Sequence, residues 1–173
     1  MQPLVYPPGV ASSRAGSRPM ESVWDYPRPP RVEPEGRRVR VELGGETVAD
    51  STRALRVLET ASPPTVYVPR SDVREELLSP AEGDRTHCEW KGHAHYLHAE
   101  AGGARAERAA WHYPEPRPGF EALKDHIAFY AGRVDACYLD EERVVPQGGE
   151  FYGGWVSAEI EGPYKGEPGS EGW

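Results

Sequence analysis

The sequence has few cysteines and no long apolar run, and each of these absences excludes a class of protein. Its two cysteines, Cys88 and Cys137, are too few for a disulfide framework. No stretch approaches the ~20 apolar residues of a membrane span. The first twenty residues contain four prolines and no apolar run, so they do not resemble a secretory signal. We therefore expect a cytoplasmic protein with reduced thiols and no membrane contact.

Positive charge is also scarce. The net charge is -8 and the pI is about 5.3. A general nucleic-acid binder needs a basic field to neutralise phosphates, so no nucleic-acid partner is expected. The acidic excess is largest at the C-terminal end, where residues 139–173 contain 2 basic and 8 acidic side chains.

What the sequence does contain is a series of short alternating segments separated by glycine turns. This pattern predicts a mainly β domain with one or two short helices. We divide the chain into a disordered leader at residues 1–20, a domain at 21–145, and an acidic, glycine- and aromatic-rich tail at 146–173. We expect the aromatic side chains of the tail to pack against the domain, or against a second subunit in a homodimer.

Two Gly-Gly pairs predict two-residue hairpin turns, because a type I′ turn needs positive φ at both positions. Around Gly44-Gly45 we expect Val41 opposite Val48, and Val39 opposite Asp50. Between the hairpins, a short helix is expected at 72–78, followed by a polar loop at 79–85. The segment 53–59 is consistent with either helix or strand.

The second hairpin centres on Gly102-Gly103 and pairs Glu100 with Arg105. The same register gives three further pairs, His98 with Glu107, Tyr96 with Ala109, and Ala94 with Trp111. One face then carries aromatic side chains. The other carries His93, His95 and His112, with His93 facing His112.

Six motifs occur together in order along residues 21–173. They are Glu21-Ser22-Val23-Trp24-Asp25-Tyr26-Pro27-Arg28-Pro29-Pro30, Thr52-Arg53-Ala54-Leu55-Arg56-Val57-Leu58-Glu59-Thr60, Pro63-Pro64-x-x-Tyr67-x-Pro69-x-x-Asp72-Val73, Thr86-x-Cys88-x-x-Lys91-Gly92-x-Ala94-x-Tyr96, Ala110-Trp111-x-Tyr113 and Tyr152-Gly153-Gly154-Trp155. In these motifs the chain resembles the "domain of unknown function 427" family of small bacterial and fungal proteins.

The resemblance implies a fold similar to the Mss4-like or β-tent class, in which two small antiparallel sheets meet at an angle. That class also holds the B-type methionine sulfoxide reductases and the cereblon ligand-binding domain. The family is also labelled a nucleotidyltransferase domain. This sequence departs from the family pattern at Glu89, where proline is usual, and His93 and His95 stand at variable positions. A transferase needs a phosphate-cradling glycine loop and paired carboxylates, which we do not find here.

The motifs suggest a partly aromatic pocket that binds a small molecule or a side chain of a partner protein. Arginine and lysine beside aromatic walls suit a small planar or anionic ligand, because the cations bind carboxylate or phosphate and the rings stack. We expect Lys91, Arg53 and Asp72 to be the polar anchors, and Trp24, Tyr67 and Trp111 the walls. Both sets of residues also have a structural interpretation. Arg53 and Asp72 would form an ion pair, and the aromatic side chains would pack at the edge of the core.

The motif around Cys88 also suggests a thiol enzyme. Lys91 and His87 lie close to Cys88 in sequence, and a nearby cation lowers the pKa of a thiol. Cys88 would be the catalytic nucleophile and Cys137 the resolving thiol. The alternative is a small buried apolar side chain, which is common for a free cysteine.

The sequence allows two further interpretations. His93, His95 and His112, with His87 or Cys88 near them, are weak candidates for a zinc site, because imidazoles and a thiolate suit zinc. The sequence lacks the Cys-x-x-Cys pair that is usual for such a site in a β-tent. The other reading is a structural or assembly module with no ligand site and no catalysis.

Overall fold

The structure is a computed structural model and describes residues 18–149, 151–167 and 170. Residues 1–17 of the predicted leader lie outside it. The described residues form fifteen short strands and four single turns of 3-10 helix, which confirms the predicted mainly β fold. The turns are η1 (Val23–Asp25), η2 (Arg70–Asp72), η3 (Glu75–Leu77) and η4 (Glu121–Leu123). Within the described ranges no helix has the length and apolar character to cross a membrane.

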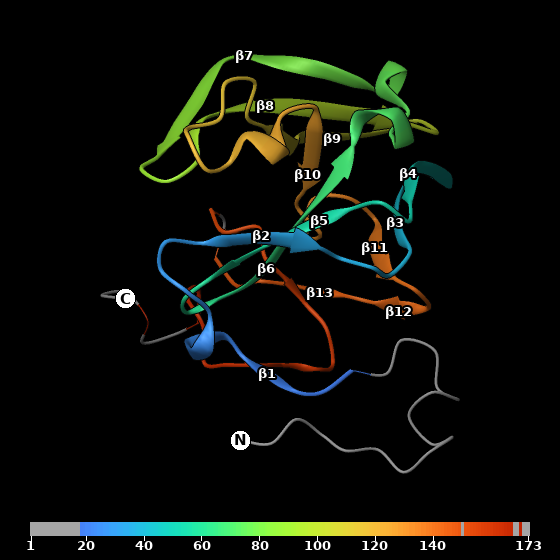
Figure 1. The fold of residues 1–173 in the computed structure, drawn as a ribbon. Coiled ribbons are helices and arrows are strands. Elements are labelled where there is room, and N and C mark those ends of the chain that lie inside the picture. The colour runs from blue at the N-terminus through green and yellow to red at the C-terminus, as the bar shows by residue number, and fades with distance from the viewer. Residues whose placement is uncertain (1–17, 150, 168–169, 171–173) are drawn as a thin grey trace.

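The larger sheet has seven antiparallel strands in the order β2-β5-β6-β10-β9-β8-β7. Figure 1 shows β7 and β8 at one extreme of the molecule. The strands are β2 (Arg31–Pro34), β5 (Leu55–Glu59), β6 (Ser62–Pro69), β7 (Leu78–Cys88), β8 (Gly92–Ala101), β9 (Ala104–His112) and β10 (His126–Phe129).

The second sheet has four antiparallel strands in the order β12-β11-β3-β4, and two short pairs complete the fold. Its strands are β3 (Val39–Leu43), β4 (Glu46–Ser51), β11 (Ala136–Leu139) and β12 (Glu142–Arg143). The pairs are β1 (Glu21–Ser22) with β15 (Ile160–Glu161), which is parallel, and β13 (Val145–Pro146) with β14 (Trp155–Val156). The C-terminal segment therefore contributes one strand, β15 or β14, to each of the two short pairs.

The seven-stranded sheet buries both of its faces. Along β6, Val66 and Val68 belong to a core cluster that also contains side chains of the four-stranded sheet, such as Val39 and Val41. Tyr67, which lies between them in sequence, belongs to a separate aromatic cluster. Successive residues of a strand point to opposite faces, so one strand supplies both clusters. The aromatic cluster is the face that holds the candidate site.

The first hairpin forms at Gly44-Gly45, which adopt φ of +60° and +80°. Its register differs from the predicted one, because Val41 pairs with Ala49, and Val39 with Ser51. A bulge next to Val41 inserts one extra residue into β4. The extra residue is Val48, and both Val48 and Ala49 are buried.

The second hairpin forms at Gly102-Gly103, and Glu100 pairs with Arg105 as predicted. Beyond that point the register moves by two residues, so Tyr96 lies opposite Trp111 rather than Ala109. The irregularity coincides with Arg108, which has φ of +46° and donates its backbone N–H to His98 Nδ1 at 3.0 Å. The change places Trp111 beside the other aromatic side chains of the sheet face.

The segment between the hairpins also differs from expectation. The short helix predicted at 72–78 is replaced by the two single turns η2 and η3, because Val73 between them is extended and pairs with Ala49 of β4. The polar loop predicted at 79–85 belongs to β7, and the ambiguous segment 53–59 contains β5. An edge strand tolerates the polar residues that suggested a loop.

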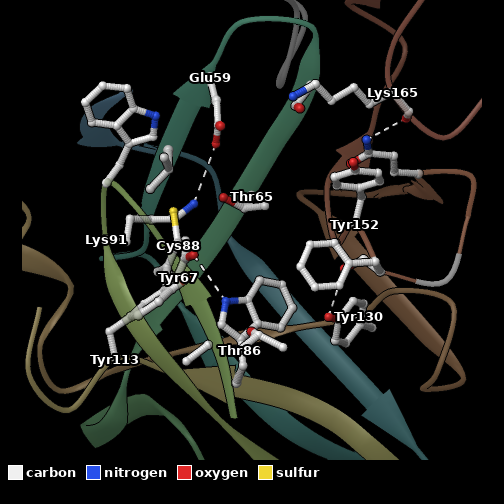
Figure 2. A pocket seen from close by; sticks show the side chains of 18 of the residues that line it. Glu59, Thr65, Tyr67, Thr86, Cys88, Lys91, Tyr113, Tyr130, Tyr152 and Lys165 are labelled. Atoms are coloured by element: carbon white, nitrogen blue, oxygen red, sulfur yellow. Dashed lines mark hydrogen bonds and ion pairs between the residues drawn. The ribbon is translucent and has the colours of Figure 1, made fainter. Parts of the chain in front are cut away.

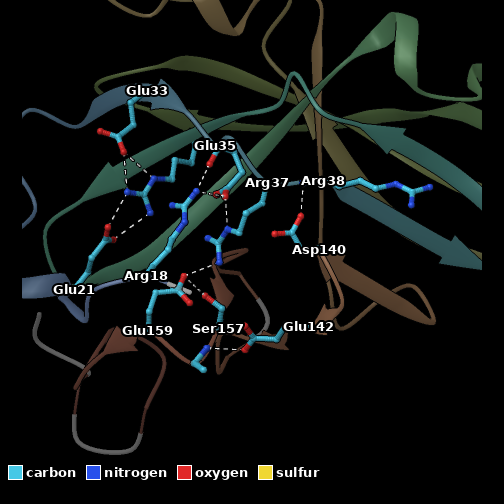
Figure 3. Close-up of polar contacts among 12 residues, drawn as sticks. Arg18, Glu21, Glu33, Glu35, Arg37, Arg38, Asp140, Glu142, Ser157 and Glu159 are labelled. Carbon is cyan, nitrogen blue, oxygen red and sulfur yellow. Dashed lines mark hydrogen bonds and ion pairs between the residues drawn. The ribbon is translucent and has the colours of Figure 1, made fainter. Parts of the chain in front are cut away.

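A cluster of buried charges joins the link between β2 and β3 to the C-terminal segment (Figure 3). Arg37 binds Glu35 at 2.6 Å and Glu159 at 2.9 Å, and all three side chains are almost fully buried. Ser157 donates to Glu159 at 2.6 Å, and Arg18 lies 3.3 Å from Glu35. We call Glu35, Arg37 and Glu159 the ionic cluster.

Candidate functional site

A cavity of about 270 Å³ lies on the aromatic face of the seven-stranded sheet (Figure 2). Strands β5, β6, β8 and β9 supply its base, and the end of β7 with the turn after it supplies one side. Tyr130 and parts of the C-terminal segment supply the opposite side. The aromatic lining consists of Tyr67, Trp90, Tyr96, Trp111, Tyr113, Tyr130, Phe151 and Tyr152.

Strand pairing brings the central rings of this wall together. Ala128 of β10 pairs with Tyr67 on one side and with Trp111 on the other, and its small side chain leaves room between them. Trp111 Nε1 donates to the Tyr67 hydroxyl at 3.2 Å, and the two rings meet edge to face at 6.1 Å. Tyr130 lies 4.6 Å from Trp111, measured between ring centroids. These contacts fix a rigid apolar surface.

Lys91 is a buried positive charge in the cavity wall. It lies in the turn between β7 and β8, where its carbonyl accepts from the Arg117 N–H at 3.0 Å, and it is only 8 % exposed. Its Nζ lies 3.6 Å from Glu59 Oε1, which is longer than an ordinary hydrogen bond. Burial opposes its charge, but interactions with Tyr67, Glu59 and Cys88 outweigh that effect and raise the pKa of Lys91. The side chain is therefore an ammonium at neutral pH.

Two tyrosine hydroxyl groups that line the cavity stay protonated. Burial, together with the proximity of Tyr67 and Cys88, raises the pKa of Tyr113. Burial also raises the pKa of Tyr130, whose hydroxyl donates to the Phe151 carbonyl at 3.0 Å. Lys165 also lines the cavity, so its walls carry two lysine side chains, of which Lys91 is the buried one.

Cys88 ends β7 and lines the cavity, and Figure 2 shows its sulfur beside the Lys91 ammonium. Cys137 is elsewhere: it is buried in the main core and belongs to β11 of the other sheet. Burial raises the pKa of Cys137. Both thiols are free, and the structure does not place Cys137 as a resolving partner for Cys88.

The C-terminal segment closes the side of the cavity opposite Lys91. A Cβ on Gly153 would lie 2.3 Å from Cη2 of Trp111, so only glycine allows this approach. Gln147 holds the segment in place, because it accepts from the Gly154 N–H at 3.0 Å and donates to the Lys165 carbonyl at 2.6 Å. Sequence reasoning did not assign Glu59, Tyr113 or this segment to the site, although Glu59, Tyr113 and Gly153 all lie in the quoted motifs.

The structure brings together four of the residues expected at the site, namely Tyr67, Cys88, Lys91 and Trp111. Arg53, Asp72 and Trp24 do not line this cavity. Arg53 and Asp72 form an ion pair at 3.1 Å, in which the Arg53 side chain is 62 % exposed. Trp24 is also at the surface, where its Nε1 donates to the Pro163 carbonyl at 2.6 Å.

Four histidines, His87, His93, His95 and His112, lie close together on β7, β8 and β9. Because of the register change, His112 lies opposite His95, and His93 lies opposite His87. His112 Nδ1 contacts Arg70 Nη2 at 2.8 Å. Burial, with the Arg70 charge second, lowers the pKa of His112 to about 4. Within the ranges that the structure covers, no group of three or more His, Cys, Asp or Glu residues has a geometry suited to a metal ion.

Comparison with known proteins identifies the family but adds no activity. Curated proteins give no match to this chain. A family model described as "Domain of unknown function (DUF427)" matches residues 31–140, well over half of the chain. The matched region contains Tyr67, Cys88, Lys91 and Trp111, whereas the cavity wall around Gly153 lies beyond it. The chain therefore belongs to the DUF427 family.

Proposed function

We propose that the protein binds a small planar aromatic molecule that carries a carboxylate or another strong acceptor. The observation that carries this proposal is Lys91, a buried ammonium at one end of a cavity walled by aromatic rings. Its contact with Glu59 is long, so the ammonium can donate to a ligand. Trp111 and Tyr67 supply the apolar surface against which a ring packs.

The dimensions restrict the ligand class. Drug-sized pockets have volumes of about 300–1,000 Å³, and this cavity lies just below that range. It therefore suits one or two fused rings rather than a large molecule. The protein groups lining it are mostly apolar or hydrogen-bond donors, and a ligand with acceptors complements them.

A matched pair of probes tests the proposal. We expect 2-naphthoate to bind to the wild-type protein and 2-naphthalenemethanol, which has the same rings without the charge, to bind at least about tenfold more weakly. Isothermal titration calorimetry measures both dissociation constants. Lys91→Met should remove the difference between the probes, whereas Lys124→Met, at an exposed lysine, should preserve it. Equal affinity of the wild type for both probes would refute the proposal.

One observation favours a second function, thiol chemistry at Cys88. Its sulfur lines the same cavity next to Lys91, and an adjacent ammonium stabilises a thiolate, which is the reactive form of cysteine. A fluorogenic thiol reagent at about pH 6 tests this idea. Rapid labelling of Cys88 that slows in Lys91→Met supports a thiol enzyme, whereas a rate no faster than that of a free cysteine peptide excludes it.

A further inference from the structure

Lysine is rare in this chain, and the aromatic cavity contains most of it. Of the 20 basic side chains in the sequence three are lysines, namely Lys91, Lys124 and Lys165. Two of the three, Lys91 and Lys165, line the cavity, whereas no arginine lines it among the residues that the structure describes. A lysine carries a compact charge on a slender flexible stem, so it can reach a small cavity without filling it as a planar guanidinium would.

The backbone of Lys165 is fixed at the edge of the cavity. Its N–H donates to the Ala61 carbonyl at 2.8 Å, and its carbonyl accepts from Gln147 Nε2 at 2.6 Å. Ala61 lies in the turn between β5 and β6, two residues after Glu59. Figure 2 shows Lys165 and Lys91 approaching the cavity from different sides. The two contacts therefore fix the point from which the Lys165 side chain reaches the cavity.

The Lys165 ammonium is not paired with a carboxylate in the part of the chain that the structure describes. Two described carboxylates line the cavity, those of Glu59 and Glu89. Glu59 pairs with Lys91 at 3.6 Å, and neither carboxylate forms an ion pair with Lys165. The side chain is only partly exposed. Lys165 is thus a second cation at the cavity that has its charge available for a ligand.

We propose that Lys165 binds a second anionic group of the ligand, so that the protein recognises an aromatic dianion, such as an aromatic dicarboxylate. The inference rests on the proposed function and extends it, because Lys91 binds the first acceptor and Lys165 distinguishes dianionic rings from monoanionic ones. An ammonium forms a charge-assisted hydrogen bond with a carboxylate. The protein has a net charge of -8, which disfavours an additional negative charge, so a gain in affinity from a second carboxylate requires a cation close to it.

Naphthalenedicarboxylates provide the test. The parent probe is 2-naphthoate, and the 2,3-, 1,6-, 2,6- and 2,7-naphthalenedicarboxylates each add one carboxylate to it at a different position. Isothermal titration calorimetry gives the ratio of the parent dissociation constant to that of each dicarboxylate. In the wild type we expect at least one isomer to bind about fivefold or more tightly than the parent, which is the contribution of one partly exposed ion pair. The isomer that gains reports the spacing of the two ammonium groups.

Four variants complete the design, each compared by the same ratio. In Lys165→Met the gain from the second carboxylate should disappear, and in Lys165→Arg part of it should remain. In Lys91→Met both probes should weaken while the ratio persists, and Lys124→Met, at the exposed third lysine, is the control and should keep the full gain. Far-ultraviolet circular dichroism and the thermal midpoint check that each variant is folded.

The outcomes separate this inference from the proposed function. If no isomer binds more tightly than 2-naphthoate, or if the gain survives in Lys165→Met, the role of Lys165 is overturned and the proposed function is left intact. If neither 2-naphthoate nor any dicarboxylate binds to the wild type, both are overturned.

Discussion

Arg37 and Lys91 are two buried cations of this protein, and they differ in how completely their charge is paired. Arg37 lies within hydrogen-bond distance of two carboxylates, at 2.6 and 2.9 Å. Among the described residues, Lys91 has one carboxylate partner, Glu59, at 3.6 Å, and its ammonium faces a cavity. A fully paired buried charge contributes to the structure, whereas an incompletely paired one beside open space is suited to a ligand. The ionic cluster and the aromatic cavity can be compared experimentally on this basis.

The largest expected effect comes from breaking the ionic cluster. Arg37→Met leaves the Glu35 and Glu159 carboxylates buried without their shared cation. Removing one partner of a buried pair destabilises a protein by about 3–5 kcal/mol, because the remaining charge is uncompensated. Urea unfolding measures the change in the free energy of unfolding. The neighbouring Arg38→Met, which breaks an exposed pair with Asp50, is the control and should change stability little. Similar losses in both variants would contradict the structural role of the cluster.

The next largest loss of stability is expected at Gly153, in the cavity wall opposite Lys91. In Gly153→Ala the new Cβ would lie 2.3 Å from the Trp111 ring, so the ring or the segment must move. Overpacking of this kind destabilises a protein by about 1–3 kcal/mol. Trp111→Phe removes the atoms that clash, so the double variant should be less destabilised than the sum of the two single variants. Additive losses, measured by urea unfolding, would show that Gly153 and Trp111 do not contact each other.

The aromatic cavity was partly predictable from sequence, because several of its residues lie on strands that can be identified from patterns within one segment. Tyr67, Cys88, Lys91 and Trp111 lie on or next to strands that alternation and Gly-Gly turns identify, so their shared region could be inferred. The distance between Lys91 and Glu59, by contrast, depends on how the turn between β7 and β8 packs against β5. Patterns within one segment do not contain that information.

The errors of register and convergence have physical causes that alternation does not reveal. The irregularity of the second hairpin coincides with Arg108, which has a positive φ and lies outside the turn sequence. Arg53 and Asp72 lie in conspicuous motifs, but their ion pair is complete at the surface. The wall around Gly153 comes from a glycine-rich segment whose path is set by the contacts of Gln147.

A smaller effect is expected from His112, a basic group that burial keeps neutral. Its pKa is about 4 in the folded protein against 6.5 as the ordinary value. Between these values the unfolded chain binds a proton at this histidine and the folded chain does not, so the free energy of unfolding should fall as the pH drops from 6.5 towards 4. Arg70, His95 and Arg85 face the ring and oppose its protonation. Urea unfolding of His112→Gln from about pH 7 to pH 5 should show a shallower fall than the wild type, with His126→Gln as the control; equal slopes would contradict it.

The smallest effect distinguishes the two cations most sharply. Without ligand, Lys91→Met should change the free energy of unfolding by less than about 1 kcal/mol, because it removes one long contact and keeps the apolar packing of the side chain. Glu59 is partly exposed, so water can solvate its carboxylate after the substitution. The same change at Arg37 leaves the buried Glu159 carboxylate without a cation partner among the described residues, and leaves Glu35 with Arg18 alone. Urea unfolding of the two methionine variants under one set of conditions gives the comparison directly. If Lys91→Met were as destabilising as Arg37→Met, Lys91 would be a structural cation, and the aromatic cavity would lose its main argument for a ligand.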